Sequence, residues 1–205
     1  MAVYLDVDMS DAKELIQRVH NAHSQRNFEQ LMYRAFKRTG GHVRQIMKND
    51  LPQHYNVTKG LIGAAVGNPE MKRGGGANVS CNIPIVGTRH SIGGTFNATG
   101  GAYGWKGIRA GKRYKIKAKI VKGTKSTLPI VMNSYGGEPP FINKSVSKVA
   151  FTRMGKDQLP IVKVVGIGIP QMPMNRAQDD VQSDIMAFLM DRIEHEHKFL
   201  ISKCR

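Results

Sequence analysis

The sequence predicts an α+β fold with N-terminal helices, a small and mainly antiparallel sheet, and a long C-terminal helix. Three observations lead to this prediction. Apolar residues recur at helical spacing within 9–66, alternate with polar residues in parts of 78–165, and return to helical spacing over 175–201. A length of 205 residues, of which 40% are hydrophobic, fits one domain with a core. We therefore expect a single domain over 1–205, built from these consecutive parts.

The N-terminal part is expected to form helices. The first ends near Ser24 and the second starts at Asn27, because apolar residues recur every three or four positions in both. The pair Gly40-Gly41 is expected to break or bend the second helix before its pattern resumes. A short further helix is expected over 57–66.

Strands are expected from Asn78 onward. Apolar residues alternate with polar ones over 79–85, which gives this strand one apolar face. Pro84 favours an edge position, because proline cannot donate a hydrogen bond to a neighbouring strand. A second alternation covers 114–120, where one face is apolar. The opposite face of that strand consists of Lys115, Lys117 and Lys119.

Residues 87–112 form a glycine-rich stretch with eight glycines in twenty-six positions. Such a stretch is too long and too rich in glycine for an ordinary connection, so it is expected to be disordered or to order against a neighbour. Phe96, Tyr103 and Trp105 are its aromatic residues. They are expected to anchor the arm in a groove of a partner, although Tyr103 and Trp105 could instead stack on bases.

The last helix is expected from about Asn175 to Ile201. Its apolar stripe comprises Val181, Ile185, Phe188, Leu189 and Phe199. Six acidic residues are expected to occupy its remaining, solvated faces.

The positive charge is concentrated in the middle of the chain. Of the net charge of +16, +12 lies in residues 71–137, which hold twelve Lys or Arg and no Asp or Glu. This bias predicts a surface that meets phosphate or an acidic partner, the alternative being a solvated basic loop. The expected surface comprises Arg109, Lys112, Arg113, Lys115, Lys117, Lys119, Lys122 and Lys125.

Three roles are open for this basic surface. It could follow a phosphate backbone without reading base sequence, face acidic residues of the next subunit in an oligomer, or only discourage association of strand edges. We rank contact with protein slightly above contact with nucleic acid.

No complete catalytic or metal-binding motif is found. Gly123–Ser126 lacks the adjacent Gly-Lys-Ser/Thr of a phosphate loop, and no serine lies in a G-x-S-x-G motif. The cluster Glu194–His197 has no second ligand pair, so it is expected to be a solvated helix face. Cys81 and Cys204 are expected to be free thiols. The sequence therefore predicts no enzyme, no catalytic residue, no cofactor and no bound metal.

Residues 149–172 carry the most specific pattern of the chain. Two runs typical of strands flank the polar turn Gly155–Gln158, which predicts an antiparallel hairpin, and a Gly-Ile-Gly-Ile-Pro-Gln-Met exit leads to the last helix. This order resembles the minor tail protein Z family of lambda-like tailed bacteriophages, the tail-completion proteins. The matching residues are Phe151, Arg153, Gly155, Leu159, Pro160, Ile161, Gly166, Pro170, Gln171 and Met172. The detailed match covers roughly a quarter of the chain, and the N-terminal two-thirds agrees only in layout.

The resemblance implies a structural virion protein that forms a ring, of sixfold symmetry, at the head-proximal end of a phage tail and helps to join tail and head. Implied partners are further copies of the chain, a tail terminator or tail tube protein, head–tail connector proteins and the end of the genomic DNA. The implied location is the tail or neck of the virion. The sequence shows neither a signal peptide nor a membrane-spanning run, so we expect synthesis in the host cytoplasm and no membrane partner. The alternative is a basic, sequence-nonspecific nucleic-acid-binding protein.

Overall fold

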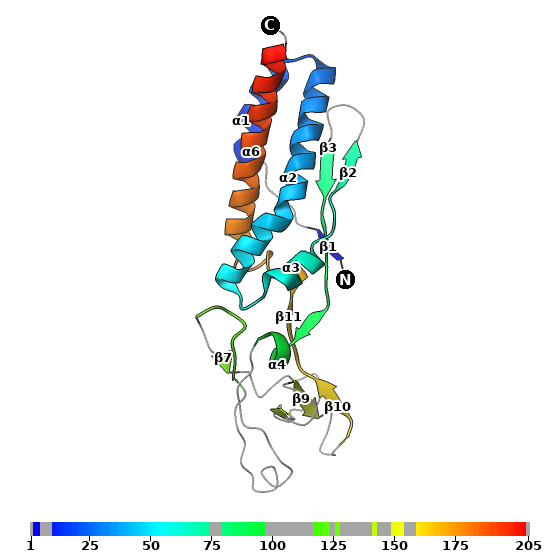
Figure 1. Ribbon diagram of the computed structural model, residues 1–205, viewed down its shortest axis with the longest axis vertical. Coiled ribbons are helices and arrows are strands. Elements are labelled where there is room, and N and C mark those ends of the chain that lie inside the picture. The colour runs from blue at the N-terminus through cyan, green and yellow to red at the C-terminus, as the bar shows by residue number, and fades with distance from the viewer. Residues whose placement is uncertain are drawn as a thin grey trace. The chain divides into compact units, whose positions relative to one another are not determined.

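The computed structural model describes residues 2–4, 10–73, 79–96, 117–123, 126–127, 141–142, 149–153 and 159–203 (Figure 1). The chain divides into two compact units. Unit 1 comprises Met1–Leu51, Thr58–Gly87 and Ile169–Arg205, and unit 2 comprises Pro52–Val57 and Thr88–Gly168. Helices, small antiparallel sheets and a long C-terminal helix together confirm the predicted α+β class.

Three helices form the main core of unit 1. A short 3-10 turn, η1 (Ser10–Ala12), leads into α1 (Lys13–Ala22), and α2 (Gln25–His54) and α6 (Gln178–Lys203) lie beside it (Figure 1). Their apolar stripes meet because apolar residues three and four positions apart share one side of a helix. The buried residues of this cluster are Ala12, Leu15, Val19, Phe28, Leu31, Met32, Ala35, Met186, Leu189 and Ile193.

The helix α2 continues through Gly40 and Gly41, so the expected break at this pair is not observed. Gly40 is buried, and a Cβ atom placed there would lie 2.6 Å from Cys81 Sγ and 2.8 Å from Pro69 Cβ. The missing side chain therefore allows close packing against α2. Helix propensity alone suggested a break, but the packing of unit 1 outweighs it.

A short helix and two pairs of strands complete the described part of unit 1. The helix α3 (Lys59–Ala65) begins at Thr58, whose Oγ1 accepts a hydrogen bond of 3.4 Å from the Leu61 N–H. The short 3-10 turn η3 (Ile169–Gln171) precedes α6. Two antiparallel sheets pair β1 (Ala2–Tyr4) with β4 (Pro84–Val86), and β2 (Glu70–Arg73) with β3 (Val79–Asn82). Pro84 thus lies in a two-stranded sheet, where every strand is an edge, as predicted.

The described part of unit 2 is built from small antiparallel sheets and one short helix, α4 (Ile92–Thr95). The predicted hairpin is present, because β9 (Ala150–Arg153) pairs with β10 (Ile161–Lys163) in the register Ile161 to Arg153 and Lys163 to Phe151. The remaining pairs are β8 (Phe141–Ile142) with β9, β11 (Val165–Gly168) with β5 (Arg89–Ser91), and β6 (Lys117–Ala118) with β7 (Ser126–Thr127).

Phe96 is a core residue of unit 2, and this corrects its prediction as an anchor in a groove of a partner. Its side chain is 0% exposed and lies close to Ile92, which is 1% exposed. A Cβ atom on Gly166 would lie 2.9 Å from Phe96 Cε2, so the glycine of the predicted motif makes room for this ring. Residues 97–116, with Tyr103 and Trp105, lie outside the described residues.

The last helix follows its predicted stripe for most of its length. Val181, Ile185 and Leu189 are buried, but Phe199 is 38% exposed, so its assignment to the core was wrong. Ile193 and Glu196 are buried instead. Within the part of the chain that the structure describes, no helix is long and apolar enough to span a membrane.

Candidate functional site

Residues 117–122, the described part of the basic strand and its following turn, are held by hydrogen bonds to their backbone. The Lys119 N–H donates to the Phe96 carbonyl over 3.0 Å, and the Asn56 side-chain amide donates to the Lys119 carbonyl over 2.8 Å. Further along, the Lys122 N–H donates to the His54 carbonyl over 2.8 Å. Main-chain contacts of this kind fix the segment while leaving its charged side chains available.

The segment alternates as predicted over the described residues. Ala118 is 1% exposed, whereas Lys119 is exposed, and Lys122 is exposed in the following turn. Lys117 lies in β6, one position before the buried Ala118. The exposed Lys119 therefore follows directly after the buried Ala118, as alternation predicts. The other expected members of the basic surface lie outside the described residues: Arg109, Lys112, Arg113, Lys115 and Lys125.

Most of the net positive charge of the chain belongs to unit 2. Unit 2 contains fifteen Lys or Arg against two Asp or Glu, which assigns +13 of the net +16 to it and leaves +3 for unit 1. Arg89 in β5 and Lys163 in β10 are exposed members of unit 2 that sequence reasoning did not include in the surface. Arg89 belongs to the basic residues of 71–137, whereas Lys163 lies outside that range, so counting charge along the chain did not group it with them.

The hairpin carries an exposed apolar edge. Leu159 is 70% exposed, Ile161 is 39% exposed and Pro160 between them is exposed. In contrast, Met172 of the same predicted motif is 0% exposed and Pro170 is buried. One part of the motif therefore supports the fold, and another part displays apolar side chains that the fold does not bury.

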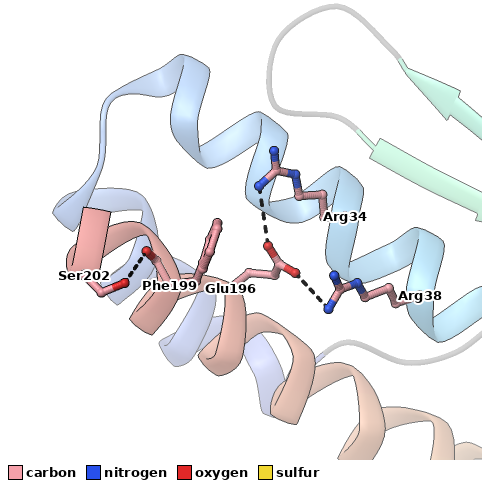
Figure 2. A network of polar contacts seen from close by, with 5 residues as sticks. All are labelled: Arg34, Arg38, Glu196, Phe199 and Ser202. Atoms are coloured by element: carbon pink, nitrogen blue, oxygen red, sulfur yellow. Dashed lines mark hydrogen bonds and ion pairs between the residues drawn. The ribbon is translucent and has the colours of Figure 1, made fainter. Parts of the chain in front are cut away.

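A buried carboxylate joins two helices of unit 1. Figure 2 shows Glu196 of α6 between Arg34 and Arg38 of α2, at 3.7 Å and 3.3 Å from their Nη1 atoms. The side chain of Glu196 is 4% exposed, while those of the two arginines are 48% and 54% exposed. The expectation that all acids of this helix are solvated was wrong for Glu196. It follows Ile193 by three residues, a spacing that would have placed it on the buried stripe.

Removing the two arginines should destabilise unit 1 more than neutralising the glutamate. Glu196→Gln leaves arginines that water can solvate, so the free energy of unfolding should change by no more than about 1 kcal/mol. Arg34→Ala with Arg38→Ala leaves a buried charge without a cation, and the expected loss is about 1–2 kcal/mol. Urea unfolding of the two variants at neutral pH tests this order. A larger loss for Glu196→Gln would contradict it.

Two histidines form a hydrogen bond between α6 and the turn that precedes α2. His23 Nε2 and His197 Nδ1 are 2.8 Å apart, and the ring centroids are 5.0 Å apart in an edge-to-face arrangement. Burial lowers the pKa of His197, and the neighbouring His23 and Arg18 lower it further, against an opposing effect of Glu194. The hydrogen bond needs one ring nitrogen without a proton, so the doubly protonated pair cannot form it. Sequence reasoning missed this pair, because the residues are 174 positions apart.

The stability of unit 1 should therefore fall as the pH falls from about 7 to 5. Because the pKa of His197 is lower in the folded state, the unfolded chain binds more protons in this pH range. The contribution of His197 to stability is therefore present above the ordinary histidine pKa and is lost as the pH falls below it. Thermal unfolding across this pH range should show a steeper decline for the wild type than for His197→Gln. Equal declines would contradict this role. His195, which is exposed on the same helix, provides the control variant His195→Gln.

The described residues contain no group of three or more His, Cys, Asp or Glu that could hold a metal ion. Cys81 is a free thiol, as expected, and burial raises its pKa, which keeps it protonated and weakly nucleophilic. Cys204 lies outside the described residues.

The fold defines an α+β protein with exposed basic and apolar residues on unit 2. No protein-family model, no curated protein and no solved structure matches the chain.

Proposed function

We propose that the chain is a structural virion protein of a tailed bacteriophage, a tail-completion or neck protein that forms a ring at the head-proximal end of the tail and helps to join tail and head. The observation that carries the proposal is the hairpin-to-helix segment at 149–172. Its residues resemble the minor tail protein Z family, and its β9–β10 hairpin and following long helix have the expected layout.

The exposure of the motif residues supports a role in contact rather than in folding alone. The run Leu159-Pro160-Ile161 is exposed although two of its residues are large and apolar. Exposed apolar residues next to basic ones are suited to a protein interface, where a polar rim surrounds an apolar centre. We propose that neighbouring copies, or a tail terminator, tail tube or connector protein, cover this edge in the virion.

The test begins with the purified full-length protein. Sedimentation velocity and negative-stain images, with and without phage tail tubes, should show rings that attach to one end of the tubes. The variant Leu159→Asp with Ile161→Asp should remain folded by circular dichroism but should not attach. Met174→Asp is the matched control, because Met174 is 44% exposed and lies outside the hairpin. A wild-type protein that stays monomeric at every concentration and ignores tail tubes would overturn the proposal.

A second candidate function is sequence-nonspecific binding of nucleic acid, and the net charge of +13 on unit 2 is the observation that favours it. Contacts with phosphate release counterions, so the affinity should fall steeply with salt. Fluorescence anisotropy with labelled DNA of two unrelated sequences would test it. Tight binding of the monomer to both, with a strong salt dependence, would favour this function over the structural one.

A further inference from the structure

The outer face of α6 is a continuous acidic stripe. Asp180, Asp184, Asp191 and Glu194 are all exposed, and their spacing returns them to one side of a helix with 3.6 residues per turn. The exposed Ala187 lies in the middle of this stripe, where its small side chain permits close approach. From the first to the last carboxylate the stripe extends about 21 Å, at 1.5 Å per residue.

The acidic stripe lies opposite the face with which α6 packs on its neighbours. The buried residues of α6 include Val181, Ile185, Leu189 and Ile193, which fall on the other side of the helix. Arg34 and Arg38 of α2 contact the buried Glu196 and not the carboxylates of the stripe (Figure 2). The helices of unit 1 therefore leave this face of α6 uncovered.

Ion pairs within α6 do not neutralise the stripe. Asp191 lies 3.5 Å from Arg192, and Glu194 lies 3.6 Å from Lys198, but the two carboxylate side chains remain 68% and 53% exposed. Exposed pairs of this kind contribute little, about 0–1 kcal/mol. Asp191 and Glu194 therefore stay available to a cationic surface.

The same chain carries such a surface on its other unit. Unit 2 has a net charge of +13, and Lys119 and Lys122 are among its exposed cations. Contact between two copies of unit 2 would bring like charges together, whereas contact between unit 2 and α6 brings opposite charges together. Two different, complementary surfaces on one chain produce a head-to-tail interface, which closes into a ring when the rotation per subunit permits.

We propose that the exposed Lys119 and Lys122 of unit 2 in one copy bind the acidic stripe on α6 in the next copy, and that this heterologous contact links the subunits. The inference rests on the proposed function, because it specifies how the ring of that proposal is built. Charge complementarity identifies the occupant of the stripe as a second copy of this chain. Repetition of the contact around a ring makes individually weak pairs collectively effective.

The test exchanges the charges of the two surfaces in the full-length protein. One variant carries Asp184→Lys and Asp191→Lys, a second carries Lys119→Glu and Lys122→Glu, and a third combines all four substitutions. Each two-residue variant should raise the concentration of half-assembly about tenfold or more, and the combined variant should restore most of it. Sedimentation velocity at low and high salt provides the readout, and high salt should weaken wild-type assembly.

The matched control reverses exposed carboxylates elsewhere in unit 1, with Glu14→Lys and Glu70→Lys. This control should assemble like the wild type, and all variants should keep the wild-type circular dichroism spectrum. This control adds the same charge of +4 as the α6 variant, so a general effect of net charge would appear in both. Restoration by the combined variant, which returns to the net charge of +16, supports a direct contact when the control assembles like the wild type.

Three results would overturn the inference. If the wild type forms rings and the α6 variant assembles equally well, the contact lies elsewhere and the proposed function stands. If the α6 variant changes only the unfolding midpoint of a monomer, the contact is within one copy. If the wild type neither assembles nor attaches to tails, the proposed function fails, and this inference fails with it.

Discussion

Leu189→Ala should lower the free energy of unfolding by about 2–5 kcal/mol, the usual range for a leucine truncated in a well-packed core. Leu189 is 2% exposed and belongs to the cluster that α1, α2 and α6 build together. Truncation removes apolar contacts and leaves a cavity that rigid neighbouring helices fill only in part. Denaturant unfolding followed by circular dichroism at 222 nm, a wavelength that reports helix, measures the change.

Phe199→Ala is the control for this prediction. Phe199 lies on the same helix but is 38% exposed, so the expected loss is well below that of Leu189→Ala. A loss for Leu189→Ala below about 0.5 kcal/mol would mean that the stripe does not face a core. Equal losses for the two variants would contradict the burial pattern of α6.

The elements of this fold that the sequence predicts are those with a strong local period. The last helix was expected over 175–201 and spans Gln178–Lys203, because its apolar positions recur regularly. The β9–β10 hairpin was also predicted, since its turn residues lie between two runs of strand-forming residues. Local pattern determines these elements, and tertiary packing only adjusts their ends.

The wrong predictions concern residues whose burial depends on contacts with distant parts of the chain. Phe96 was expected to be an exposed anchor in a glycine-rich arm, yet Gly166, seventy positions later, makes room for its ring in the core of unit 2. Glu196 was expected to be solvated, yet Arg34 and Arg38 of α2 make its burial tolerable. The contacting residues lie far away in the sequence in both cases. The burial of Phe96 and Glu196 therefore cannot be predicted from the segment around each residue alone.

The candidate contact surface was predicted in part for the same reason. Of the predicted alternation, the structure describes a buried Ala118 and an exposed Lys119. Assigning the exposed Arg89 and Lys163 to the same unit as the basic strand required knowledge of which segments form unit 2. The +13 of unit 2 differs from the +12 of residues 71–137, because unit 2 excludes Lys72 and Arg73 and includes residues 138–168, which carry a net charge of +3.

Two adjacent glycines of α2 should respond to alanine with opposite signs. Gly41→Ala should raise the free energy of unfolding by about 0.5–1 kcal/mol, because alanine favours a helix interior and no atom lies within 4 Å of its Cβ position. Gly40→Ala should lower it by about 1–3 kcal/mol despite the same gain in helix propensity. At Gly40 the new Cβ would lie 2.8 Å from Pro69 Cβ, and the proline ring cannot rotate away.

The difference between the two variants, about 1.5–4 kcal/mol, isolates packing from propensity, because both changes have identical chemistry at neighbouring positions of one helix. Urea unfolding of both proteins at one temperature measures it. Cys81→Ala removes the Sγ atom that lies 2.6 Å from the same Cβ position, so it should recover part of the Gly40→Ala loss and none of the Gly41→Ala gain. If Gly40→Ala stabilises the protein as Gly41→Ala does, then the strands β2 and β3 do not pack against α2 at this point, and Gly40 has no structural role in the interior of that helix.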